Sequence, residues 1–208
     1  MSGHRKSKSR DAILEAAAAL LSRNPGASLT EVAEAAGVGR ATLHRHFPSR
    51  DALVRELALD AIRLTDEATA NIEREATSAV DAMRRTLEAV IPLGDRFRFL
   101  ATEPTALRDP DVDAAYRRQL AELTELVDAM RREGAIGSDL PAAWVATTID
   151  SLIYAAWTAV HEGAIARNDA ATLVFRTLLH GIGPVDTPED SPLTSSTTPQ
   201  KKDRGGNP

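Results

Sequence analysis

The chain has 208 residues and no cysteine, which excludes a disulfide framework and any site that depends on a thiolate. Hydrophobic residues make up 43% of it, enough for a sizeable core, yet no apolar run reaches the length of a membrane span. Residues 1–50 hold eight Lys and Arg against four Asp and Glu, whereas the remaining 158 residues carry a formal net charge of -9. Unless this asymmetry is chance clustering, it predicts a polyanion-binding N-terminal end on an acidic body. The absence of cysteine and of an apolar leader segment leads us to expect a cytoplasmic protein.

The first two helices are predicted from the spacing of apolar residues and from residues that typically begin or end a helix. Apolar side chains recur at helical spacing over 13–21, and Asn24-Pro25-Gly26 ends that element. Ser28 and Glu31 have the spacing of a capping box, in which each side chain satisfies a free backbone N–H at a helix start. Gly37 tolerates left-handed backbone geometry, so we expect the second helix to stop there.

A third helix is predicted over about 40–47, followed by Ser49 as the N-cap of a long helix from Arg50 into the low seventies. Further helices are expected at about 78–91, 95–103, 111–133, 141–163 and 170–181. Gly134 is placed to end the 111–133 helix, Pro141 suits a first turn, and Asp169 is the expected N-cap of the last helix. Strand and hairpin signals are nearly absent, which predicts an all-α fold.

Residues 28–47 form the pattern of two helices joined by a tight turn. Ala33 and Ala36 permit close approach of the helices, while Leu43 and Phe47 are four residues apart and share an inward face. This is the helix-turn-helix pattern, whose second helix enters the major groove of DNA. A solvated basic surface on an ordinary helical hairpin is the alternative interpretation.

The segment SLTEVAEAAGVGRATLHRHFPSRDALV resembles the DNA-binding signature of the TetR family of bacterial repressors. The matching positions are Ser28, Ala33, Ala36, Gly37, Val38, Thr42, Leu43, His46, Phe47, Ser49 and Leu53, with Val32 where Ile is usual. The preceding segment RDAILEAAAALLS also resembles the first helix of that family. The resemblance implies an all-α homodimer with an N-terminal three-helix DNA-binding domain and a C-terminal helical domain that binds an effector and dimerises.

The residues that the motif and the resemblance indicate for DNA contacts lie in the basic end of the chain. They are Arg5, Lys6, Lys8, Thr30, Gly39, Arg40, Ala41, Thr42, His44, Arg45, His46 and Arg50. Arginine can donate two hydrogen bonds to guanine, and threonine can contact a thymine methyl or a phosphate. Gly39 replaces the usual Ser or Thr and weakens the cap of the recognition helix, His44 replaces a usual Tyr, and Arg50 replaces Lys with its charge preserved.

The same resemblance places an effector cavity in the C-terminal half and pairs the last two long helices with their counterparts in a four-helix bundle. The helices at 141–163 and 170–181 are therefore the expected homodimer seam. The expected ligand-binding residues are Phe97, Phe99, Leu100, Glu103, Met130, Asp150, Tyr154 and Trp157, each of which could equally be plain core. Aromatic side chains with an occasional polar group suit a small, mainly apolar molecule.

These observations divide the chain into a basic flexible arm (1–9), a helix-turn-helix domain (10–54), a helical effector-binding and dimerisation domain (55–183) and a Pro-rich disordered tail (184–208). No Walker loop, GxSxG, GxGxxG or HExxH occurs, and His44 and His46 diverge on a helix. We therefore expect no enzyme, cofactor or metal site. The indicated function is a ligand-responsive repressor of a palindromic DNA operator. An effector-independent DNA-binding protein and a helical protein-interaction module are the alternatives.

Overall fold

A computed structural model describes residues 2–97, 106–137 and 139–181, and for residues 2–8 and 107 it describes the backbone alone. This part of the chain is helical and contains no strand, which confirms the predicted all-α class. The elements are α1 (Ser2–Leu21), α2 (Leu29–Ala35), α3 (Arg40–His46), α4 (Arg50–Thr69), α5 (Ile72–Glu75), α6 (Ala79–Val90), η1 (Ile91–Leu93), α7 (Gly94–Phe97), η3 (Ala106–Arg108), α8 (Pro110–Arg132), α9 (Ala142–His161) and α10 (Arg167–His180). None of the helices described here has the length and apolar character needed to cross a membrane.

Local hydrogen bonds fix the ends of the N-terminal helices where the sequence predicts them. The Ser28 hydroxyl accepts from the Glu31 N–H at 3.3 Å, while the Glu31 carboxylate accepts from the Ser28 N–H at 2.7 Å. Gly37 ends α2 with φ +65°, and α3 begins after Gly39 without a side-chain cap. The Ser49 hydroxyl accepts from the Ala52 N–H at 3.1 Å and caps α4.

Several helix boundaries differ from those expected. Helix α1 already begins at Ser2, so the backbone of the segment predicted as a flexible arm is part of that helix. Helix α10 begins at Arg167, and Asp169 lies in its first turn instead of capping it. A carboxylate in the first turn is favourable because the helix dipole is positive there, which explains why the same residue suits both positions. The short α5 was not predicted, the helix expected at 95–103 is described only as far as Phe97, and the tail from 184 lies outside the described residues.

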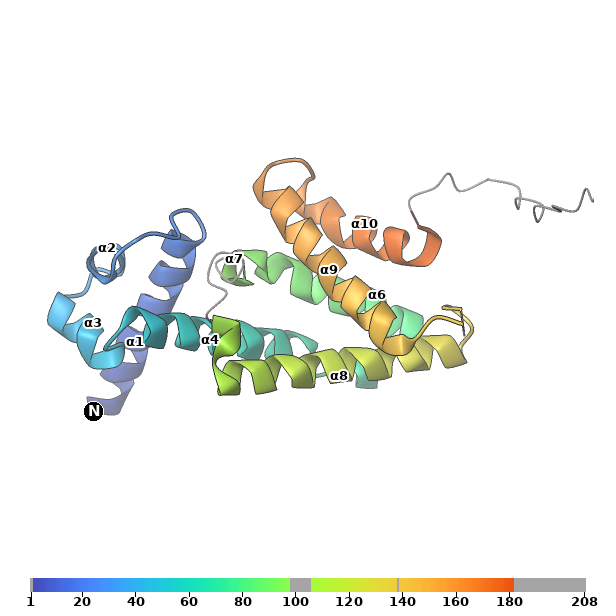
Figure 1. Cartoon of the computed structure of the whole chain (residues 1–208), viewed down its shortest axis with the longest axis horizontal. Helices are drawn as coiled ribbons and strands as arrows, with labels where there is room; N and C mark the ends of the chain where they lie inside the picture. The colour runs from blue at the N-terminus through green and yellow to red at the C-terminus, as the bar shows by residue number, and fades with distance from the viewer. Residues whose placement is uncertain (1, 98–105, 138, 182–208) are drawn as a thin grey trace, which may run out of the picture.

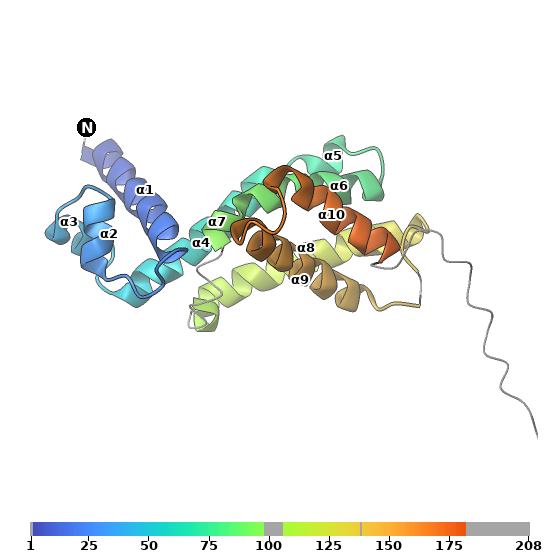
Figure 2. The ribbon, with the colours of Figure 1, turned by 90° about the horizontal axis from the view of Figure 1, so that it is seen from above.

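The described helices bury two hydrophobic clusters. The first is built from the four helices α1, α2, α3 and α4 and includes the fully buried Leu43. Ala106 and Val112 from the C-terminal domain also belong to it. The second is built from α6, α8, α9 and α10 around Met83, Met130 and other buried residues. Both views place α1 to α3 at one end of the molecule, with α4 running from them into the larger helical body (Figures 1 and 2). Helix α4 therefore connects the N-terminal helices to the C-terminal body, and Ala106 and Val112 of that body pack into the first cluster.

The turn of the helix-turn-helix offers a matched pair of glycine substitutions. Gly37→Ala should lower the free energy of unfolding by about 1–2 kcal/mol, because a Cβ atom in left-handed backbone crowds the following carbonyl oxygen. An added Cβ meets nothing else within 4 Å at either Gly37 or Gly39, and only Gly37 has a positive φ. Gly39→Ala should therefore change the free energy of unfolding by less than about 0.5 kcal/mol. Urea denaturation measures both, and equal losses would contradict the role of backbone conformation at Gly37.

Candidate DNA-binding surface and ligand cavity

Helix α3 separates a buried face from an exposed basic face. Leu43 and Phe47 are at most 1% exposed and anchor the helix in the first hydrophobic cluster. The exposed residues of α3 are Arg40, Ala41, His44 and Arg45, with Thr42 and His46 half-buried at its margins. The helix contains no acidic residue. It therefore presents cationic and neutral hydrogen-bond donors to the outside, which suits the edges and phosphates of DNA.

The other residues predicted to contact DNA differ in how far they are exposed and in whether their side chains are described. Arg45 Nη2 donates to Thr42 Oγ1 at 3.4 Å, so these two side chains lie on the same face of α3. Thr30 is half-buried near the start of α2, and Gly39 is exposed at the start of α3. The side chains of Arg5, Lys6 and Lys8 lie outside the described residues, although their backbone is in α1.

Arg50 does not have the outward orientation expected of a phosphate contact. Its guanidinium donates to the carbonyl oxygens of Ala27 at 2.6 Å and of Pro25 at 2.5 Å. These carbonyls belong to the loop between α1 and α2, where no helix supplies a hydrogen-bond partner. Arg50 therefore fastens this loop to the start of α4, and its contact with DNA stays a prediction.

The C-terminal domain contains a cavity of about 880 Å³ between α4, α5, α6, α8 and α9. Its volume is in the range of sites that take small organic molecules. Much of its wall is apolar, with Ile62, Val90, Val112 and Leu123 among the lining residues. A second hollow of about 440 Å³ lies between the start of α4 and the start of α8 and is lined by Arg55, Arg108 and Asp109 among others.

An aromatic pair forms one part of the cavity wall. The rings of Phe97 and Trp157 stack with centroids 4.7 Å apart and an interplanar angle of 15°. The indole N–H of Trp157 donates to the Ile91 carbonyl at 3.0 Å, which fixes the ring. A Cβ atom at Gly94 would lie 2.3 Å from Trp157 Cδ1, so the absence of a side chain there lets the indole pack flat on α7. Two aromatic rings held by their mutual stacking and by the Ile91 carbonyl therefore line this part of the cavity.

A polar pair lies on the same cavity wall. The Tyr116 hydroxyl donates to the Asp150 carboxylate at 2.6 Å, joining α8 to α9. Burial, and then this hydrogen bond, raise the pKa of Tyr116 well above its ordinary value, so the phenol remains a protonated donor. Among the described residues, no Arg, Lys or His forms an ion pair with Asp150, and its described partner is the Tyr116 hydroxyl.

The charged residues of the lining are predominantly acidic. Among the lining residues that the structure describes, Asp66, Glu73, Glu122, Glu125 and Asp150 contribute carboxylates, and Arg118 is the one basic residue. Arg118 donates to Asp66 at 2.6 Å and to Glu122 at 2.9 Å, so its charge is already matched. Carboxylates thus outnumber basic groups among the described lining residues, which favours a cation over an anion in the cavity.

The structure brings together half of the predicted ligand-binding residues. Phe97, Asp150, Tyr154 and Trp157 line the cavity. Met130 is corrected, because it is fully buried in the second hydrophobic cluster and does not line the cavity. Phe99, Leu100 and Glu103 lie outside the described residues.

Sequence reasoning missed the contribution of α4 and of the first half of α8 to this wall. The missed lining residues include Ile62, Thr65, Asp66, Thr69, Tyr116 and Gln119. Those on α4 recur at helical spacing with polar and apolar side chains mixed, whereas a helix packed only against a core has a purely apolar inward face. The mixture of polar and apolar residues on this face of α4 is the sequence feature that could have indicated a cavity-lining helix.

The comparisons with known proteins agree with this geometry. Residues 13–57 match the family described as bacterial regulatory proteins, tetR family. The chain is 33% identical over 177 residues to the HTH-type transcriptional repressor LfrR of Mycolicibacterium smegmatis, which spans 85% of this chain and 92% of that protein. It is 26% identical over 171 residues to the HTH-type transcriptional regulator NfxB of Pseudomonas aeruginosa, which spans 81% of this chain and 91% of that protein.

Solved structures show the same relationship. The crystal structure of the TetR-like regulator LfrR from Mycobacterium smegmatis in complex with proflavine superposes with a TM-score of 0.75 at 30% identity, covering 88% of this chain and 99% of the other. A further LfrR crystal structure gives a TM-score of 0.59 at 27% identity, covering 83% and 99%. With the matched helix-turn-helix and the similarity to LfrR along most of its length, the chain belongs to the tetR family of bacterial regulatory proteins and is a ligand-responsive, DNA-binding transcriptional regulator, not an enzyme.

Proposed function

We propose that this protein is a homodimeric repressor that leaves a palindromic operator when a planar aromatic cation enters its cavity. The observation that carries the proposal is the combination of a stacked aromatic pair in the cavity wall with the Asp150 carboxylate, which forms no ion pair with any described residue. Planar cations gain from stacking and from cation–π attraction to Trp, and a carboxylate in a partly desolvated site supplies the counter-charge. Proflavine, the molecule bound to the related LfrR, is a planar aromatic cation.

On the DNA side, we assign sequence reading to the exposed face of α3. Arg40 is exposed at the first turn of α3, where recognition helices contact base edges, while Arg45, Thr42 and His44 follow along the helix. Two copies of this helix, about one DNA turn or roughly 34–36 Å apart, would read the two half-sites of an operator. A ligand that changes this spacing lowers operator affinity because both helices no longer fit together.

The dimer seam is assigned to α9 and α10. Trp144 is 65% exposed, and the exposed residues of α9 between it and Tyr154 carry no charge. A solvent-facing stripe without charge is unusual for a helix, whereas it is expected of a face covered by a second subunit. The exposed face of α8, by contrast, carries Arg117, Glu122, Glu125 and other charged residues.

Operator binding tests the assignment of α3. Fluorescence anisotropy with DNA flanking the protein's own gene should show a preference of roughly a thousandfold over scrambled DNA at about 150 mM salt. Arg40→Ala should weaken operator binding by about 1–3 kcal/mol because a base contact is lost. Arg74→Ala removes the same charge from exposed α5 and should leave operator affinity unchanged. Equal effects of the two substitutions would show that α3 does not read the DNA.

Subunit association tests the dimer seam. Thr147→Arg places a charge on the uncharged stripe of α9 and should convert the dimer to monomers, because an unpaired charge is costly to bury. Ala121→Arg introduces the same side chain on the exposed, charged face of α8 and should leave the dimer intact. Analytical ultracentrifugation measures both, and a dimeric Thr147→Arg protein would place the seam elsewhere.

Ligand titration tests the role of Asp150. Proflavine should bind the wild-type protein and release it from the operator, and Asp150→Asn should weaken proflavine binding by about 1.5–3 kcal/mol because a charge-assisted contact is lost. Asp128→Asn removes a carboxylate from the exposed face of α8, outside the cavity lining, and should bind proflavine as the wild type does. Isothermal titration calorimetry measures both affinities. Unchanged binding by Asp150→Asn would rule out Asp150 as the counter-charge.

A further inference from the structure

The first two turns of α8 contact both the ligand cavity and the DNA-binding domain. At one end, Asp109 caps α8 by accepting from the N–H groups of Asp111 and Val112 at 3.1 and 3.3 Å. At the other end, the Tyr116 hydroxyl reaches across the cavity wall to Asp150. Seven residues of one helix, about 10 Å at 1.5 Å per residue, therefore separate the helix cap from the polar pair of the cavity.

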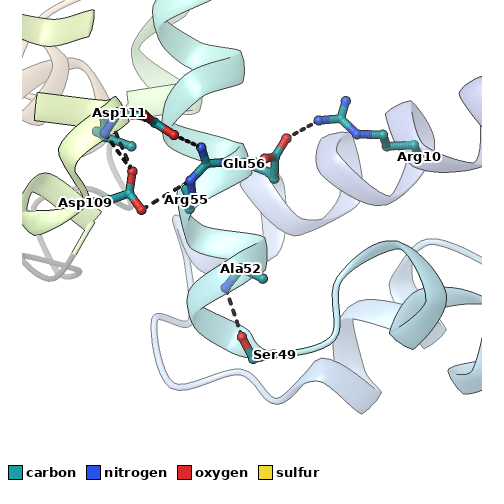
Figure 3. Close-up of polar contacts among 8 residues, drawn as sticks. Arg10, Ser49, Ala52, Arg55, Glu56, Asp109 and Asp111 are labelled. Atoms are coloured by element: carbon teal, nitrogen blue, oxygen red, sulfur yellow. Dashed lines mark hydrogen bonds and ion pairs between the residues drawn. The ribbon is translucent and has the colours of Figure 1, made fainter. Parts of the chain in front are cut away.

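A continuous chain of charged contacts runs from the start of α8 through α4 to α1 (Figure 3). Arg55 on α4 pairs with Asp111, and its Nε lies 3.2 Å from an Asp109 carboxylate oxygen. The same guanidinium donates to the Glu56 carboxylate at 2.6 Å, and Glu56 in turn accepts from Arg10 on α1. The hydrogen bond to Asp111 is the main reason that the pKa of Arg55 is raised, so the guanidinium stays charged.

Apolar packing follows the same route. Val112 is fully buried in the hydrophobic cluster that holds the helix-turn-helix, and the Tyr116 ring packs against that cluster. Val112 and Tyr116 also line the ligand cavity. The first turns of α8 thus contact the ligand cavity on one side and the core of the DNA-binding domain on the other, so a displacement of these turns would alter both contacts.

The charged contacts of Arg63, also on α4, stay within that helix. Arg63, two turns further along, pairs with Asp60 and Glu67 at 2.6 Å each, and both partners belong to α4 itself. Such pairs support the helix locally. The contacts of Arg55 and Glu56, in contrast, link three separate helices at a partly buried junction where the side chains are 32% and 29% exposed.

We infer that the first two turns of α8 carry the ligand signal to the DNA-binding domain, through the contacts of Asp109 and Asp111 with Arg55 and onward through Glu56 to Arg10. The inference rests on the proposed function. A cation at Asp150 competes with the Tyr116 hydroxyl for the carboxylate, and Tyr116 then repacks with the start of α8. Because Arg55 holds that start to α4 and Glu56 holds α4 to α1, the DNA-binding domain changes its orientation.

The test compares ligand binding, operator binding and their coupling in variants of the full chain. For each protein, the proflavine affinity without DNA and the operator affinity with and without saturating proflavine are measured. The wild type should lose operator affinity about tenfold or more on adding proflavine, within the usual range of allosteric coupling. Arg55→Gln and Asp111→Asn should bind proflavine within about twofold of wild type but lose most of that coupling, leaving roughly a threefold effect or less.

Arg63→Gln is the matched control, because it removes an arginine of the same helix whose partners lie on α4 itself, and it should couple as the wild type does. The Asp111 side chain is 69% exposed, so its substitution preserves the fold even if Arg55→Gln is unstable. Tyr116→Phe should bind proflavine more tightly, since no hydroxyl competes for Asp150, yet couple more weakly. A merely structural Tyr116 would not produce this split.

The outcomes separate the inference from the proposed function. If the wild type responds to proflavine and Asp111→Asn responds to the same extent, the route through α8 is overturned while the proposed function stands. If the wild-type protein keeps its operator affinity in saturating proflavine, the proposed effector response fails, and the inference fails with it. A loss of coupling in Arg63→Gln equal to that in Arg55→Gln would also overturn the inference, because any charge on α4 would then suffice.

Discussion

The sharing of α4 between two domains is the constraint on which the rest of the structure depends. Its first half buries Leu53, Val54 and Leu57 in the cluster that holds the helix-turn-helix, while Ile62, Thr65 and Thr69 further along line the ligand cavity. A helix of 20 residues is about 30 Å long and resists bending because its backbone hydrogen bonds would have to lengthen. The cavity and the helix-turn-helix core are therefore joined by one stiff helix.

The N-terminal 50 residues of the chain are net basic and the rest is net acidic, which gives its two ends different binding properties. Basic residues on α3 face outward without a neighbouring acid in the same helix, so they are available to phosphates and base edges. The carboxylates of the C-terminal domain line much of the polar part of the cavity, and their charge repels the DNA backbone from that domain. The same asymmetry separates the basic, DNA-binding end of the chain from its acidic C-terminal domain.

The helix-turn-helix was predictable because its signals are local. The capping pair of Ser28 and Glu31, the positive φ of Gly37 and the cap at Ser49 each depend on residues within three or four positions of one another. The start of α10 was harder to predict, since Asp169 is equally suitable as an N-cap and as a first-turn residue. Only the packing of that helix decides between the two.

The sequence by itself determined the helical class, the DNA-binding motif and the separation of charge, because periodicity, caps and composition are properties of neighbouring residues. Tertiary structure alone decided that Arg50 turns inward to the loop carbonyls, that Met130 is core, and that Tyr116 meets Asp150 across 34 positions of the chain. The chemical type of a side chain determines which kinds of partner it can bind. Which partner it meets depends on long-range packing, since that packing sets which surfaces are buried together and which space remains open.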